Sequence, residues 1–228
     1  MRAAYYSLRP GGWRDYVTLI HWPYTLWNLA YVCIGAALAP AWLPGRLVAG
    51  LVAFFLGLGI AAHALDELKG RPLGTRIPSP VLWGLAGGAL AGAVGIGVAA
   101  AIVWTPWLLA FVAFGAFMVC AYNLELFGGR FHGDWQLALA WGATPILSAY
   151  LVAAEKLTWQ AGFAALFGVL LIVAQRRLST PVRAVRRRMP EVEDAARAAL
   201  IAGAEDALQA MMAAVVALAI ALVILRAT

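Results

Sequence analysis

The chain has 228 residues, of which 64% are hydrophobic and only 12% charged, and its mean hydropathy is +0.82. This composition excludes a soluble globular domain, because so apolar a chain would expose large hydrophobic patches to water. The net charge of +6 does not indicate nucleic-acid binding, since no stretch combines basic and aromatic residues, and arginines beside anionic lipid headgroups account for it. We therefore expect an integral membrane protein that contacts membrane lipid and no nucleic acid.

Seven apolar runs are each close to the ~20 residues that a helix needs to cross the hydrocarbon. In chain order they lie at residues 16–39, 47–65, 81–103, 105–125, 135–154, 158–175 and 207–225. The sequence thus predicts an all-α fold, a polytopic transmembrane helical bundle of about seven helices that forms a single domain over residues 1–228. Tryptophans near the ends of the runs are typical of the aromatic belts at membrane interfaces.

Basic residues are unevenly shared between the two sides of these runs. With the N-terminus inside, all but three of the 17 lysines and arginines fall in inside segments. An excess of Lys and Arg in cytoplasmic loops is the main determinant of topology, so we expect residues 1–15 to be cytoplasmic in a multi-pass protein of a bacterial-type inner (cytoplasmic) membrane. Residues 176–206 form a long cytoplasmic connection, in which an alanine-rich helix either lies at the membrane surface or continues into the last span.

The second apolar run ends in a cluster of ionisable groups at residues 63–76. In a helix that ends near Leu68, His63 precedes Asp66 by three residues and Glu67 by four, so its ring can share a face with either carboxylate. Asp66 and Glu67 themselves point about 100° apart, as successive residues on a helix must. Two adjacent carboxylates are costly within hydrocarbon, which indicates a wet boundary or a polar cavity.

Three basic residues, Lys69, Arg71 and Arg76, follow this helix end directly. Carboxylates that hold Mg²⁺ through oxygen, beside arginines that bind phosphate oxygens in pairs, are the groups that a magnesium diphosphate requires. The alternative is a helix end whose charged side chains reach the lipid headgroups and form internal ion pairs.

These residues resemble the first acidic motif of the UbiA superfamily of intramembrane prenyltransferases. In that family an Asn or Asp precedes an Asp by three or four residues at the end of the second helix, and an Arg-Pro-Leu element follows, which residues 62–66 and 70–73 match here. Residues 122–134 resemble the family's fourth helix end, with a Tyr and a later basic residue, and residues 142–145 its Gly-x-x-Pro-like element. The opening residues 19–25 look like its first helix, without the usual Arg before the Pro.

The resemblance covers residues 15–188 in the family's order, and it has a clear departure. The second Asp-rich motif is missing, because its place is taken by residues 175–183, which contain no carboxylate, and one further span follows instead of three. Arg176, Arg177 and Arg183 are candidates to contact the diphosphate in its place, since a guanidinium supplies charge and paired donors without a metal.

The resemblance implies transfer of a prenyl group from a prenyl diphosphate to a lipophilic or aromatic acceptor within the membrane, with Mg²⁺ as the suspected cofactor. Asp66 and Glu67 are then the predicted metal ligands, and both are predicted catalytic residues together with His63. The predicted substrate-binding residues are Lys69, Arg71, Arg76, Tyr122, Asn123, Arg130, Arg176, Arg177 and Arg183.

Two alternatives remain open. The missing second motif also fits a catalytically degenerate membrane protein of the same fold that binds an isoprenoid or quinone, or that assists a partner subunit. The group formed by His63, Asp66 and Glu67 also fits a transition-metal or proton site of a transporter.

Other polar residues have simpler interpretations. Tyr122 fits an interfacial anchor as well as a substrate contact. His21 fits an intramembrane polar residue with satisfied hydrogen bonds, and His132 and Asp134 fit a solvated loop.

Overall fold

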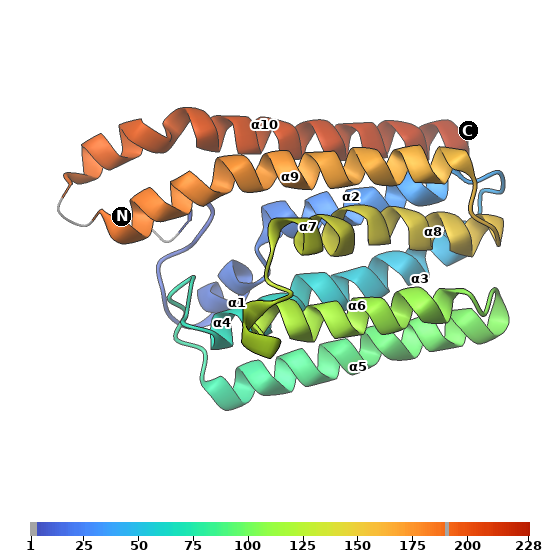
Figure 1. Ribbon diagram of the computed structural model, residues 1–228, viewed down its shortest axis with the longest axis horizontal. Helices are drawn as coiled ribbons and strands as arrows, with labels where there is room; N and C mark the ends of the chain where they lie inside the picture. The colour runs from blue at the N-terminus through green and yellow to red at the C-terminus, as the bar shows by residue number, and fades with distance from the viewer. Residues whose placement is uncertain (1–3, 190–191) are drawn as a thin grey trace.

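The computed structural model describes residues 4–189 and 192–228, which form helices and no strands (Figure 1). The predicted all-α class is therefore confirmed for the described residues. Five helical segments are long and apolar enough to cross a membrane: Pro44–Leu68, Ser79–Val103, Asp134–Ala154, Trp159–Arg186 and Asp194–Ala227. Two shorter helices lie among them, α2 (Trp22–Leu38) with 17 residues and α6 (Leu108–Asn123) with 16.

The first apolar run is two helices and not one, which corrects the predicted span at 16–39. A short helix α1 (Trp13–Leu19) ends before His21, and α2 begins directly after it. The His21 backbone has φ 48° and ψ 48°, a left-handed conformation that a helix cannot continue through. Pro23 then lies in the first turn of α2, where its missing N–H is not needed.

Two of the long segments contain a stretch of π-helix. The segment from Pro44 to Leu68 consists of α3 (Pro44–Phe54), the π-helix η1 (Phe55–Ala62) and α4 (His63–Leu68). The segment from Asp134 to Ala154 consists of α7 (Asp134–Leu137), η3 (Ala138–Ala143) and α8 (Thr144–Ala154). Because π-helical turns are rare and occur often at functional sites, the two stretches indicate where to look for one.

The remaining elements complete an antiparallel bundle: α5 (Ser79–Val103), a 3₁₀ turn η2 (Phe127–Gly129), α9 (Trp159–Arg188) and α10 (Asp194–Ala227) (Figure 1). At 1.5 Å per residue, α9 and α10 are about 45 and 51 Å long, more than the ~30 Å of hydrocarbon. The predicted connection at 176–206 is therefore largely helical, and its second half is continuous with the last span. The α9–α10 hairpin projects past the ends of α2, α4 and α6.

Helix α2 begins at the same side of the bundle at which α4, α6 and α9 terminate. We call this side the polar end and the opposite side the far end. Helix α2 packs between α8 and α10, and its Trp27, Tyr31 and Val32 are almost fully buried. Helix α9 approaches η3 so closely that a Cβ atom on Gly142 would lie 2.7 Å from the carbonyl oxygen of Gly168. Small residues at such crossings let membrane helices pack with their backbones in contact.

Candidate functional site

The Glu67 side chain is fully buried at the end of α4 and holds the loop that follows. One carboxylate oxygen accepts hydrogen bonds from the Thr75 backbone N (2.8 Å) and from Thr75 Oγ1 (2.8 Å), and the other accepts one from the Leu73 backbone N (2.9 Å). Both oxygens are thus committed to the loop. This geometry assigns Glu67 a structural role and does not favour the metal and catalytic roles predicted for it.

Arg71 closes the same loop from the other side. Its backbone has a positive φ of 53°, and its guanidinium donates hydrogen bonds to the Ile77 carbonyl (2.5 Å) and to Ser79 Oγ (2.9 Å). Glu67 and Arg71 together therefore fix the chain between α4 and α5.

The other two basic residues of this loop point elsewhere. Arg76 has an exposed side chain, and only its backbone N–H is engaged, with Asp15 Oδ2 at 2.9 Å. Lys69 forms an exposed ion pair with Glu125, at 3.7 Å. The three predicted phosphate contacts of this loop do not converge on one point in the structure.

Asp66 and Arg183 of α9 are both half-buried, and both influence Tyr6, a residue of the N-terminal segment. Burial raises the pKa of the Tyr6 phenol well above its usual value, the neighbouring Tyr24, Tyr5 and Asp66 raise it further, and Arg183 opposes them. Charges from both the predicted acidic part and the predicted basic part of the site therefore act on this phenol.

Tyr6 also leads to a pair of histidines in the helix ends. Its hydroxyl forms a hydrogen bond with His21 Nδ1, at 2.8 Å. The His21 ring stacks on the His63 ring, with centroids 4.3 Å apart and planes 14° apart. His63 Nδ1 donates to the Gly59 carbonyl of η1, at 3.1 Å. The pair explains the left-handed turn at His21, which aims the ring at His63.

Tyr122 connects the polar end with the interior of the bundle. It is buried, stacks on His132 at 4.3 Å and touches Trp141 of η3, whose ring centroid lies 5.1 Å away. His132 Nδ1 donates to the Tyr122 carbonyl (2.9 Å), so His132 is not the solvated loop residue that we expected. The Asn123 amide is also buried, and it donates to the Val119 carbonyl within its own helix.

The predicted basic residues of α9 divide into two groups. Arg176 is mostly buried and donates to Asp134 Oδ1 at 2.8 Å, and Arg183 is half-buried. Arg177 is exposed, as is Arg130 in the loop after α6. Arg176 and Arg183 are thus the two predicted α9 contacts that lie within the polar end, and Asp134 is exposed, as we expected, while it pairs with Arg176.

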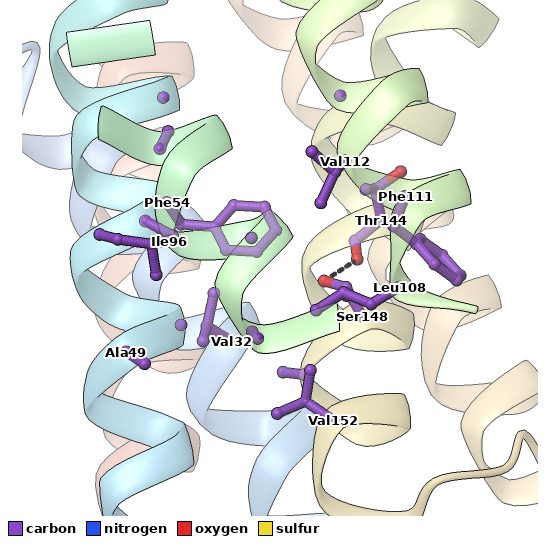
Figure 2. A pocket seen from close by; sticks show the side chains of 18 of the residues that line it. Val32, Ala49, Phe54, Ile96, Leu108, Phe111, Val112, Thr144, Ser148 and Val152 are labelled. Atoms are coloured by element: carbon purple, nitrogen blue, oxygen red, sulfur yellow. Dashed lines mark hydrogen bonds between the residues drawn. The ribbon is translucent and has the colours of Figure 1, made fainter. Parts of the chain in front are cut away.

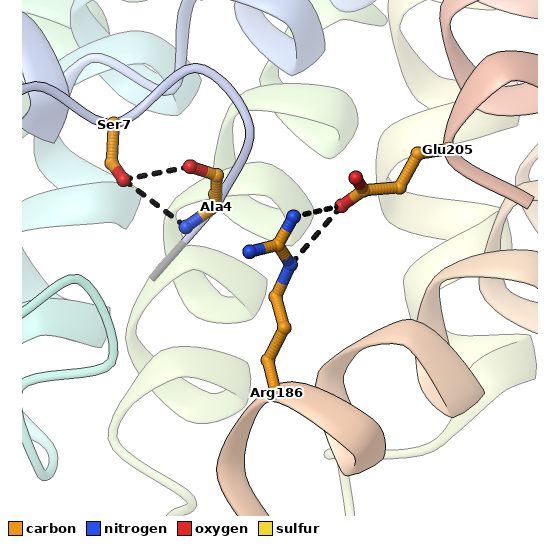
Figure 3. A network of polar contacts seen from close by, with 4 residues as sticks. All are labelled: Ala4, Ser7, Arg186 and Glu205. Atoms are coloured by element: carbon orange, nitrogen blue, oxygen red, sulfur yellow. Dashed lines mark hydrogen bonds and ion pairs between the residues drawn. The ribbon is translucent and has the colours of Figure 1, made fainter. Parts of the chain in front are cut away.

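A buried ion pair joins α9 to α10 beside the N-terminal segment (Figure 3). Arg186 donates to Glu205 Oε1 from Nη2 (2.5 Å) and Nε (3.1 Å), and the two side chains are 9% and 14% exposed. Burial raises the pKa of Tyr5, and Glu205 contributes to this rise, so the N-terminal segment packs against the hairpin. The segment and the hairpin together cover the polar end.

An apolar cavity lies below this site, between α2, α3, α5, α6 and α8 (Figure 2). It has a volume of about 130 Å³ and is lined mainly by aliphatic residues and glycines. Trp141 and Met118 line it toward the polar end, and Arg46 and Trp104 line it at the far end. Because Trp141 also touches Tyr122, the cavity begins directly beneath the polar residues.

Sequence reasoning missed the role of Tyr6, because this residue lies in a segment without any motif. The signal for His21 was present, because a histidine in an apolar run must find partners in the fold.

Among the described residues, no three His, Cys, Asp or Glu side chains gather to hold a metal ion. A magnesium ion that arrives with a diphosphate needs only one or two protein carboxylates, because phosphate oxygens and water complete its shell. Glu67 does not fit this requirement, since both of its oxygens are committed, and Asp66 stays the predicted carboxylate for it. The transition-metal or proton site predicted at His63, Asp66 and Glu67 is disfavoured for the same reason.

No family model, no curated protein and no solved structure matches this chain. The fold therefore defines the class, an all-helical membrane protein with a polar cluster above an apolar cavity. The resemblance to the UbiA superfamily stays a prediction.

Proposed function

We propose that the protein is a UbiA-like intramembrane prenyltransferase, which moves a prenyl group from a prenyl diphosphate to a lipophilic or aromatic acceptor. In this proposal α2 and α6 cross the membrane together with the five longer segments, which makes seven spans. The polar end lies on the cytoplasmic side of the inner membrane, because most basic residues lie at this end.

The main observation behind the proposal is that the charged residues of the polar end lie next to the apolar cavity. Charges of Asp66 and Arg183 both act on the Tyr6 phenol at the polar end, and Tyr122 joins this end through Trp141 to an apolar cavity. A prenyl diphosphate has the same two parts, a strongly anionic head and an apolar chain. Its head matches the arginines and its chain matches the aliphatic lining.

The reaction breaks the bond between the allylic carbon and the diphosphate oxygen, and the diphosphate leaves with the electron pair. A nucleophilic atom of the acceptor forms the new bond to the prenyl carbon and loses a proton, for which Asp66 and His63 are our candidate bases. Arg176 and Arg183 stabilise the negative charge that develops on the leaving group. Mg²⁺, held by Asp66, would supply further positive charge to the diphosphate.

The test is turnover by the full-length protein reconstituted in lipid vesicles with a radiolabelled farnesyl diphosphate, a mixed aromatic and lipid acceptor pool, and Mg²⁺. We expect release of diphosphate and a prenylated product, and we expect Asp66→Asn and Arg183→Gln each to reduce the rate by roughly 100-fold or more, the effect of losing a charge contact in the transition state. Glu125→Gln, which alters only an exposed ion pair at the same end, is the control and should keep the wild-type rate. If wild-type protein neither binds the diphosphate nor forms product, the proposal is wrong.

A second candidate is a binding protein of the same fold without turnover. The engagement of Glu67 favours it, because a carboxylate that was predicted to be catalytic holds the loop instead. This candidate predicts that wild-type protein binds the diphosphate, that no product forms, and that Asp66→Asn binds as well as wild type.

A further inference from the structure

The far end of the apolar cavity is lined by an arginine that links its own helix, α3, to the ends of two others, α5 and α8. Arg46 lies in the first turn of α3, and its guanidinium carbon lies 5.1 Å from the centre of the Trp104 ring, at the end of α5. Its Nη1 donates to the Val152 carbonyl (2.6 Å) and to Glu155 Oε1 (2.9 Å), both at the end of α8.

These contacts make the closure hard to displace. An apolar chain that pushed Arg46 aside would separate a mostly buried charge, 22% exposed, from its carbonyl, carboxylate and aromatic partners. Leaving a buried charge unpaired is far more costly than leaving part of an apolar chain outside the cavity. Arg46 and Trp104 therefore act as a fixed wall and not as a flexible lining.

The position of the wall limits what fits inside. Along α6 the cavity runs from Leu108 to Val119, eleven residues and so about 16 Å. With roughly 1.25 Å per bond of an extended carbon chain, from ordinary bond lengths and angles, this depth takes about twelve main-chain carbons.

We infer that Arg46 and Trp104 set the length of the hydrophobic chain that the cavity accepts, with an upper limit of three isoprene units. Each isoprene unit contributes four main-chain carbons, so geranyl and farnesyl chains end before the wall. The fourth unit of a geranylgeranyl chain needs the space that Arg46 and Trp104 occupy. This inference rests on the proposed function, because it takes the cavity as the place of the prenyl chain.

The experiment compares chain lengths by competition binding to the full-length protein in lipid nanodiscs. The competitors are geranyl, farnesyl and geranylgeranyl diphosphates and, in a second series, the three corresponding alcohols, which lack the anionic head. We expect wild type to bind the farnesyl form roughly tenfold more tightly than the geranylgeranyl form, since part of a fourth unit stays unburied. Trp104→Ala should remove most of this difference, and Trp104→Phe should reduce it by less.

The matched control is Trp107→Ala, because Trp107 lies at the same end of the bundle but is 75% exposed and does not line the cavity. It should leave the order of affinities unchanged, and a comparable melting temperature shows which variants are folded. If the alcohols are sorted by length and the diphosphates do not bind, the length limit holds and the proposed prenyl transfer is wrong. If wild type and both Trp104 variants bind all chain lengths in the same order, or if neither series binds, the inference is overturned.

Discussion

The Glu67→Gln variant tests whether the Glu67 carboxylate holds the loop between α4 and α5 or binds a metal ion. An amide offers one acceptor oxygen where the carboxylate offers two, so the variant keeps the two bonds to Thr75 and turns an N–H group toward the Leu73 N–H. A buried donor that loses its acceptor costs about 1–3 kcal/mol. If this free energy destabilises the loop alone, the fraction of molecules in which the loop is locally unfolded rises by roughly 5- to 150-fold.

The assay is limited trypsin digestion of the protein in detergent, because the loop carries its own cleavage sites. Lys69 and Arg76 lie at its two ends, whereas the bond after Arg71 precedes Pro72 and resists trypsin. We expect Glu67→Gln to accelerate cleavage at Lys69 and Arg76 by the factor above. Glu125→Gln is the matched control, since its partner Lys69 lies 3.7 Å away in an exposed pair that contributes little.

If Glu67→Gln digests at the wild-type rate but loses Mg²⁺-dependent binding of a prenyl diphosphate, then Glu67 is a metal ligand and the hydrogen bonds to the loop are incidental. Faster digestion with unchanged binding assigns Glu67 to the loop.

Three further outcomes are expected from the packing and the charges. Gly142→Ala should lower the melting temperature by an amount equivalent to about 1–3 kcal/mol, because its Cβ would meet the backbone of α9, whereas Gly203→Ala has open space and should be neutral or slightly stabilising. Arg186→Met should destabilise by about 3–5 kcal/mol in chemical unfolding, because Glu205 then loses this partner in a mostly buried position, and adding Glu205→Met should restore most of the loss. The pKa of Tyr6 is raised in the folded protein, so above about pH 10 the unfolded chain loses the phenol proton while the folded protein keeps it. The free energy of unfolding should therefore fall as the pH rises above about 10. Tyr6→Phe should make this fall less steep when unfolding is measured as a function of pH.

The helices were largely predictable, because apolar length is a strong signal in a membrane protein. The break at His21 was not, since its left-handed backbone depends on Tyr6 and His63, which are distant in the chain. The extension of α9 to Arg188 and the start of α10 at Asp194 were also only partly predictable. Charged residues there indicate water, but they do not prevent a helix from extending beyond the hydrocarbon.

The sequence predicted which residues lie in the candidate site, but it did not predict what each side chain does there. Helix geometry alone states that Asp66 and Glu67 point about 100° apart, but it does not say which one faces the loop. That choice is made by Leu73 and Thr75, whose N–H groups need acceptors in a buried turn. The sequence also placed Arg71 with the phosphate contacts, whereas the structure uses its donors to hold the Ile77 carbonyl.

The direction in which a chain would lie in the cavity follows from two independent observations. In the sequence, basic residues are concentrated on the side of the polar end. In the structure, two far-end arginines already donate to backbone carbonyls, Arg46 to Val152 and Arg226 to Ala39 and Pro40. A diphosphate at the far end would have to compete for those donors, and few other basic residues lie on that side. An anionic head at the polar end, with its chain directed toward Arg46, is therefore the orientation that both observations favour.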